Sequence, residues 1–224
     1  MFRTKLADRK LPGYTNGEEI FNMASHIVGG ALSIAALTLC VVFSALKGDP
    51  WAVVSSAVYG TSLIFMYTFS SIYHGLRSES AKKVMQILDH CMIYFLIGGT
   101  YTPLTMCSIR KVSEVWAWII FGAIWLLAAV ATVFTAIDLK RFAKLSMICY
   151  ILMGWLVVIA SRILLEAISL NGFLWLIGGG IAYTAGAVIY IAGKKYRYMH
   201  SVFHLFVLAG SILHFFCILL YVIL

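Results

Sequence analysis

The sequence predicts an all-α integral membrane protein with seven transmembrane helices. Hydrophobic residues make up 62% of the 224 residues and charged residues only 12%, about half the charged fraction of an ordinary soluble domain. Apolar stretches long enough to cross about 30 Å of hydrocarbon, which takes about 20 residues, recur seven times. The basic residues alternate between successive connections, as expected when every apolar stretch crosses the membrane once.

The apolar stretches follow one another with short connections, so we expect neighbouring helices to be antiparallel and in contact. Residues 24–224 therefore form one seven-helix transmembrane domain, and residues 1–23 form an N-terminal tail. In this tail, Asn16 is the predicted N-cap of a helix whose first turn carries Glu18 and Glu19. The seven predicted spans are 24–46, 51–74, 84–108, 114–136, 145–167, 171–192 and 198–224.

The basic residues predict the orientation of the chain. The basic residues are divided unequally between the two membrane faces. Only Lys47, Arg110 and Lys111 lie on the face opposite the N-terminal tail, and Arg162 falls within the fifth span. Because Lys and Arg are enriched in cytoplasmic connections, we expect a cytoplasmic N-terminus, an external C-terminus and a location in the cell (inner) membrane. This placement in short connections argues against nucleic acid as the reason for the net charge of +8. The other basic residues, all on the side of the tail, are Arg3, Lys5, Arg9, Lys10, Arg77, Lys82, Lys83, Lys140, Arg141, Lys144, Lys194, Lys195 and Arg197.

Ionisable side chains inside the predicted spans are the candidates for function, because they are costly to bury in lipid. His200 and His204 are four residues apart on the last span, so both imidazoles lie on one helix face, one turn apart. This spacing suits two ligands of one metal ion. The sequence between them contains no glutamate, which excludes the HExxH motif of soluble metalloproteases.

Two further residues share the depth of this histidine pair. His200 lies three residues after Arg197, His74 three residues before Arg77, and Asp89 six residues after Lys83. At 1.5 Å per residue, the four side chains fall within roughly 5–11 Å of the basic connections. We therefore predict a metal site near the cytoplasmic face with His74, His200, His204 and Asp89. Three histidines and a water are a common catalytic zinc arrangement, although imidazole also suits iron, copper and nickel.

The remaining polar residues are weaker candidates. Ser70 lies four residues before His74, on the same helix face; its hydroxyl either serves the site or bonds back to its own helix. His26 begins the first span and is expected to donate to the outer shell of the site. His90 points about 100° away from Asp89. His214 lies about 15 Å deeper than His204, too far to share its metal.

At these residues the sequence resembles the hemolysin III family of bacterial membrane proteins. That family is related to the adiponectin and progestin receptors (the PAQR family). The resemblance covers nearly the whole chain. It implies a seven-helix bundle, a cytoplasmic N-terminus and a zinc ion held by His74, His200 and His204, with Asp89 reaching zinc through a water and Ser70 nearby. The matching motifs are Glu18-Glu19 before His26, Ser70-x-x-x-His74, Leu88-Asp89-His90, Gly99-Thr100-Tyr101-Thr102-Pro103, and His200-x-x-x-His204 followed by His214-Phe215.

The wider superfamily includes alkaline ceramidases, so the resemblance implies hydrolysis of a lipid amide. The first hypothesis is therefore a zinc-dependent hydrolase that takes a ceramide-like membrane lipid, with Asp89 and Ser70 as catalytic residues. Two alternatives are a cytolysin, as the family name suggests, and a receptor or sensor in which zinc is structural. Three histidines with an open position are more typical of catalytic than of structural zinc.

Overall fold

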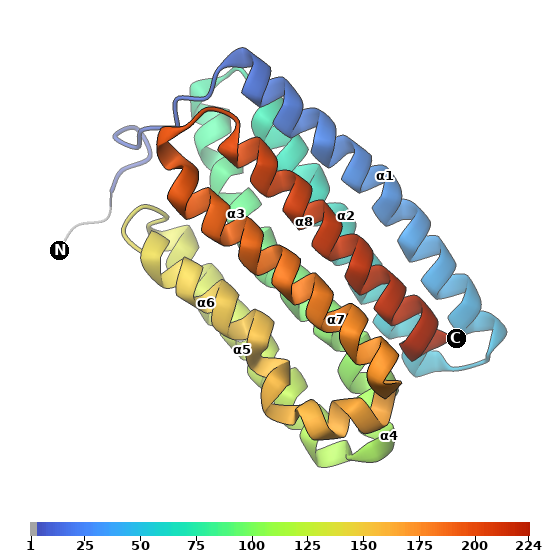
Figure 1. The fold of residues 1–224 in the computed structure, drawn as a ribbon. Helices are drawn as coiled ribbons and strands as arrows, with labels where there is room; N and C mark the ends of the chain where they lie inside the picture. Colours follow the sequence, from blue (N-terminus) through green and yellow to red (C-terminus); the bar gives the residue numbers. More distant parts are fainter. Residues whose placement is uncertain (1–3) are drawn as a thin grey trace.

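The computed structural model describes residues 4–224, which form helices and short connections without a β-strand. The long helices run lengthwise through one bundle (Figure 1). Short 3₁₀ or π segments and one helical turn complete the chain: η1 (Leu104–Ile109), α4 (Arg110–Val112), η2 (Leu156–Ala160), η3 (Gly193–Lys195) and η4 (Leu219–Ile223). The long helices are α1 (Asn16–Leu46), α2 (Pro50–Gly75), α3 (Glu79–Pro103), α5 (Glu114–Ile137), α6 (Ala143–Trp155), α7 (Ser161–Ala192) and α8 (Met199–Ile218).

Within residues 4–224, six helical segments are long and apolar enough to cross a membrane. One of them, Ala143–Lys195, has 53 residues and as a single straight helix would be about 80 Å long. It is broken at Ser169, whose φ of 63° and ψ of 169° are non-helical. Figure 1 shows the chain turning back between α6 and α7. An all-α membrane protein is thus confirmed, while the count of seven crossings stays a prediction.

The first helix begins earlier than the predicted span 24–46 because Thr15 caps it. The Thr15 hydroxyl accepts a hydrogen bond from the Glu18 amide at 3.3 Å, and the Glu18 carboxylate accepts one from the Thr15 amide at 2.8 Å. This reciprocal capping box satisfies two amides that a helix start leaves unpaired. The predicted cap, Asn16, is wrong by one residue. The early start places two additional helical turns, with Glu18 and Glu19, ahead of the predicted apolar span.

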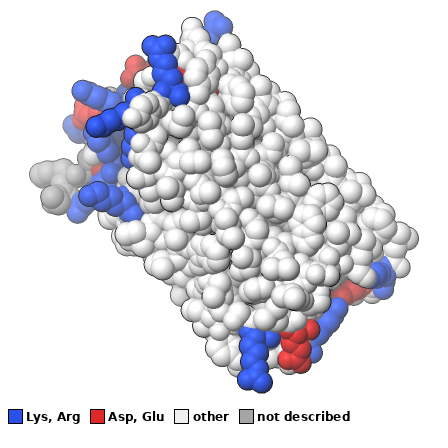
Figure 2. All heavy atoms as spheres, in the orientation of Figure 1, with Lys and Arg blue, Asp and Glu red and all other residues white. Residues whose placement is uncertain are grey.

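Charged side chains gather at the two ends of the molecule, with a broad uncharged band between them (Figure 2). At one end the segments that carry most basic residues contact one another. The Thr4 amide donates to Asp138 Oδ2 at 2.8 Å, Lys83 Nζ donates to the Ala7 carbonyl at 3.0 Å, and the Tyr198 amide donates to Glu18 Oε1 at 2.7 Å. We call this the basic end. Its predicted cytoplasmic location stays a prediction, and Arg3 lies outside the described residues.

The contact between the tail and Asp138 is insensitive to pH near neutrality. The Thr4 amide bond, together with the bond from the Arg141 amide, lowers the pKa of Asp138 from 3.8 to about 2. The carboxylate is therefore ionised in the folded protein at every pH above that value. The stability that the contact contributes is present above the ordinary Asp pKa and is lost only as the pH falls toward 2.

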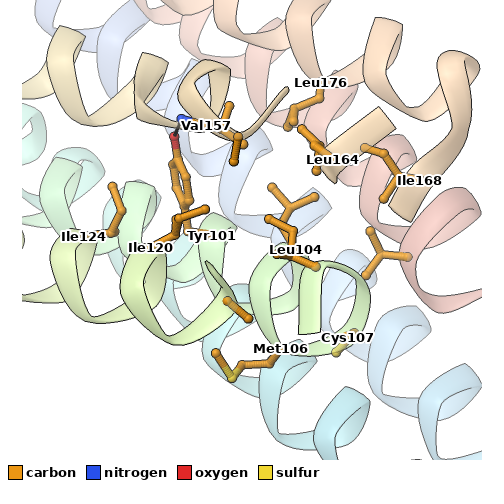
Figure 3. Packing of buried hydrophobic residues seen from close by; sticks show 14 of the residues in the cluster. Tyr101, Leu104, Met106, Cys107, Ile120, Ile124, Val157, Leu164, Ile168 and Leu176 are labelled. Carbon is orange, nitrogen blue, oxygen red and sulfur yellow. Dashed lines mark hydrogen bonds between the residues drawn. The ribbon is translucent and has the colours of Figure 1, made fainter. Parts of the chain in front are cut away.

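Tyr101 belongs to the hydrophobic core toward the opposite end (Figure 3). Its hydroxyl donates to the Met153 carbonyl at 2.9 Å and accepts from the Val157 amide at 2.8 Å. These bonds satisfy backbone groups that the change from α6 to η2 leaves unpaired. Leu104 and Leu164 pack in the same cluster and are almost fully buried. Most buried polar atoms without a partner among residues 4–224 lie instead toward the basic end.

Close packing of α1 on α2 predicts the effect of one substitution. A Cβ added at Gly29 would lie 2.4 Å from the Tyr67 ring, and the hydroxyl of Tyr67 is held by Ser211 Oγ at 2.8 Å. We expect Gly29→Ala to cost about 1–3 kcal/mol through overpacking and to lower the unfolding temperature of the detergent-solubilised protein. Gly122→Ala is the control, because its Cβ would meet no atom within 4 Å. Equal unfolding temperatures for the two variants would contradict this packing.

Candidate metal centre

Three histidines from two helices meet at the basic end. His74 is the penultimate residue of α2, while His200 and His204 occupy the first two turns of α8. His200 Nε2 lies 3.4 Å from His74 Nε2 and 3.1 Å from His204 Nε2. One ring nitrogen from each histidine lies within 4.8 Å of the other two. The structure therefore brings together three of the four predicted metal ligands.

The spacing of these nitrogens fits a metal ion. Two imidazole nitrogens bound tetrahedrally to zinc at 2.0–2.1 Å are about 3.3–3.4 Å apart, close to the two Nε2 separations. The Nδ1 atoms of His200 and His204 are buried without a hydrogen-bond partner. The facing nitrogens bring several lone pairs together in one buried space. A cation among them would compensate these lone pairs.

Glu19 orients His74 from the first turn of α1. Its Oε2 lies 2.7 Å from His74 Nδ1, and its Oε1 lies 2.8 Å from Lys82 Nζ. A proton on Nδ1 donated to the carboxylate leaves the His74 Nε2 lone pair free for a metal, the usual arrangement around metal-binding histidines. From the sequence, Glu19 is predicted only to be an acid at a helix start and part of a family motif. Glu19 lies seven residues before His26, so the two side chains are two turns apart on the same helix face. This spacing could have indicated that Glu19 lies near the site.

Asp89 and Ser70 lie beside the three histidines and do not belong to the cluster. Both line a cavity that His200 and His204 also line. The Asp89 carboxylate is 3.5 Å from His90 Nδ1, and this same nitrogen lies 2.8 Å from the Gln86 carbonyl. The predicted roles of Asp89, as a ligand through water and as a catalytic residue, stay predictions. The same holds for the catalytic role of Ser70.

Two aromatic rings pack on the α8 histidines. His26 stacks on His204, with ring centroids 3.7 Å apart and planes at 18°, and both nitrogens of His26 are buried without a partner. His26 therefore contacts the site through its ring face, whereas the sequence analysis expected a hydrogen-bond donor. Tyr14 stacks on His200 at 4.9 Å and 12°. Burial raises the pKa of Tyr14 well above its usual value, so this phenol stays neutral over the physiological range.

The cavity beside the histidines has a volume of about 180 Å³ and extends to His214. Its walls come from α1, α2, α3, α6, α7 and α8, and most of the side chains that line it are apolar or aromatic. His214 contributes to the far wall, where its Nε2 lies 3.0 Å from the Leu176 carbonyl. It takes no part in the three-histidine cluster, as its predicted depth required. The site thus combines possible metal ligands, a carboxylate and a hydroxyl with an apolar space.

Comparison with known proteins gives one consistent family. A family model described as Haemolysin-III related matches residues 14–215. Hemolysin-3 from Bacillus cereus is 40% identical over 205 residues, covering 92% of each chain. The Hemolysin-3 homolog from Bacillus subtilis (strain 168) is 38% identical over 208 residues, covering 93% of this chain and 96% of the relative. The human monocyte to macrophage differentiation factor is 23% identical over 195 residues, covering 84% and 78%, which supports the predicted relationship to the PAQR family.

The contact between Glu19 and His74 predicts how metal affinity responds to mutation. Glu19→Gln keeps the size of the side chain and removes the charge that favours a proton on His74 Nδ1. Loss of such a partner typically weakens metal affinity 10–100-fold, and we expect this for zinc titrated into the metal-free protein against a competing chelator.

Glu79→Gln is the matched control, because this exposed acid pairs with Lys83 away from the histidines. We expect it to bind zinc as the wild type does. A Glu19→Gln protein that keeps the zinc affinity of this control would show that the carboxylate does not support the site.

Proposed function

This chain belongs to the haemolysin-III related family, and from that premise we propose that it is a zinc-dependent hydrolase embedded in the membrane. Its substrate is a lipid amide of the ceramide type, which enters from the bilayer. One observation carries the proposal: the three converging histidine nitrogens lie at an apolar cavity that also holds the carboxylate of Asp89 and the hydroxyl of Ser70. An amide hydrolase needs these parts in one place.

The proposed roles follow from the chemistry of the side chains. His74, His200 and His204 would hold the zinc ion, which when bound would act as a Lewis acid that acidifies water and polarises a carbonyl. Asp89 accepts a proton from the attacking water and returns it to the leaving amine. The hydroxyl of Ser70 donates a hydrogen bond to the carbonyl oxygen as negative charge develops there. Water adds across the amide bond, and the products are a fatty acid and an amine.

The proposed topology has seven crossings with the basic end in the cytoplasm, in the cell (inner) membrane. The break at Ser169 supports the seventh crossing, because it divides a 53-residue segment between the two predicted spans. The gathering of basic segments at the end that holds the N-terminal tail supports the orientation. The histidine cluster then lies near the inner leaflet, where an acyl lipid can reach it sideways.

Membrane lysis is a second candidate, favoured by the name of the 40% identical relative from Bacillus cereus. Lysis and hydrolysis differ in their need for the histidines. Liposome leakage that persists in His200→Ala and His204→Ala would favour lysis. Zinc with a purely structural role predicts a lower unfolding temperature after chelation and no release of fatty acid.

Hydrolysis predicts a specific pattern among variants. The zinc-loaded protein should release fatty acid from at least one member of a panel of N-acyl lipids, measured by mass spectrometry. Asp89→Asn should lower the rate at least about 100-fold, because it removes the general base. Its zinc content should stay unchanged. His204→Ala should lose both zinc and activity.

Glu166→Gln is the control for the loss of one acid, because this exposed residue belongs to α7 outside the cavity lining; its rate should match the wild type. Two results would contradict the proposal. One is a zinc-loaded wild type that releases no fatty acid from any lipid of the panel. The other is an Asp89→Asn protein as active as the control.

A further inference from the structure

A second hollow adjoins the metal centre on the side of the basic end. It has a volume of about 470 Å³ and lies between the N-terminal tail, the end of α7 and the start of α8. We call it the vestibule and define it by Tyr14, Tyr190, Lys194, Lys195, Arg197 and His200, which all line it. Tyr190 and His200 also line the apolar cavity. The two spaces therefore meet at one of the three clustered histidines.

The vestibule is positively charged. Lys194, Lys195 and Arg197 contribute to its lining and belong to no ion pair among residues 4–224. Lys194 Nζ lies 5.5 Å from the centre of the Tyr190 ring, a cation–π contact that holds this charge at the boundary with the cavity.

The acid in the vestibule lining is already engaged. Oε1 of Glu18 accepts a hydrogen bond from the Tyr198 amide, and its Oε2 accepts bonds from the amide and the hydroxyl of Thr15. These bonds belong to the start of α1 and tie it to the start of α8. The Glu18 carboxylate keeps its negative charge while it accepts these bonds, so the three basic side chains of the vestibule exceed the acid by two positive charges, which are available for an anion.

We propose that the vestibule binds the phosphate of an anionic lipid headgroup, so that the substrate of the proposed hydrolase is an N-acyl lipid that carries a phosphate. Three cations suit a group with one to two negative charges and several acceptor oxygens. Lipid phosphates also lie at the membrane surface, where this end of the protein is expected. With the phosphate in the vestibule, the acyl chain would lie in the apolar cavity. The amide bond, which lies between these two parts of the lipid, would then be next to the histidines.

The substrate part of this inference rests on the proposed hydrolysis, whereas the binding part does not. Binding is therefore measured with a probe that cannot be hydrolysed, a dioctyl-ether glycerol phosphate, added to the full chain in an uncharged detergent. Native mass spectrometry gives the affinity. The same ether glycerol without phosphate, and inorganic phosphate alone, are the comparison ligands. We expect the ether phosphate to bind at least tenfold more tightly than either.

The decisive variant is the triple substitution Lys194→Gln, Lys195→Gln and Arg197→Gln. Its matched control is Lys140→Gln, Arg141→Gln and Lys144→Gln, which removes three positive charges from the connection between α5 and α6 and from the first turn of α6, at the same end. We expect the first triple variant to bind the ether phosphate at least tenfold more weakly than the wild type, and the control to stay within about twofold. Unfolding temperatures close to that of the wild type establish that both variants are folded.

Three outcomes would overturn the inference. Equal losses in the two triple variants would mean that the basic residues act only through general surface charge. Equal affinity for the ether glycerol without phosphate would mean that the headgroup is not recognised. Inorganic phosphate as tight as the ether phosphate would assign the vestibule to a soluble anion. A protein that binds the ether phosphate as expected but hydrolyses no lipid would refute the proposed function and leave this binding site standing.

Discussion

The candidate metal centre depends on the contacts of the Glu19 carboxylate with His74 and Lys82. This carboxylate lies on α1 and contacts His74 of α2 and Lys82 of α3 at 2.7 and 2.8 Å, so one partly buried acid joins three helices. The same stretch of α1 reaches α8, because the Tyr198 amide donates to Glu18 and the Ser201 hydroxyl donates to Asn22. The first two turns of α1 thus set the distance between the helices that carry the histidines. Polar groups are costly to leave unpaired within a membrane. These pairs therefore favour this one arrangement of the helices.

The cost of unpaired polar groups within a membrane also distinguishes the two ends of the molecule. At the end away from the tail, Tyr101 satisfies the freed backbone of η2 and the apolar core packs closely around it. Toward the basic end, buried histidine nitrogens have no partner, and the cavity and the vestibule meet at His200. Most of the unpaired buried polar atoms of residues 4–224, together with the vestibule, therefore lie toward the basic end, and the cavity runs from there to His214. Such concentration is typical of a functional site, because elsewhere it would only destabilise the fold.

The sequence predicted most helices and the three clustered histidines, because hydropathy and charge placement report directly on burial in lipid. It also indicated a division of the long segment around Ser169, since the predicted spans stop at residue 167 and resume at 171. It did not reveal the role of Glu19, because an acid in a first helical turn is explained equally well by the helix dipole. The stacking of His26 on His204 could not be predicted either. Ring orientation depends on how two helices rotate about their axes, and helical periodicity alone does not determine this rotation. Thr15 and Asn16 are both good N-caps, so only the observed hydrogen bonds could decide between them.

The most direct test of the central claim is X-ray absorption spectroscopy at the zinc edge of the purified, zinc-loaded protein. We expect one zinc per chain with three imidazole nitrogens at about 2.0–2.1 Å and a further light ligand. In His200→Ala the number of imidazole ligands should fall. A zinc ion surrounded by sulfur at about 2.3 Å, or a wild-type spectrum unchanged by His200→Ala, would contradict a metal centre built from His74, His200 and His204.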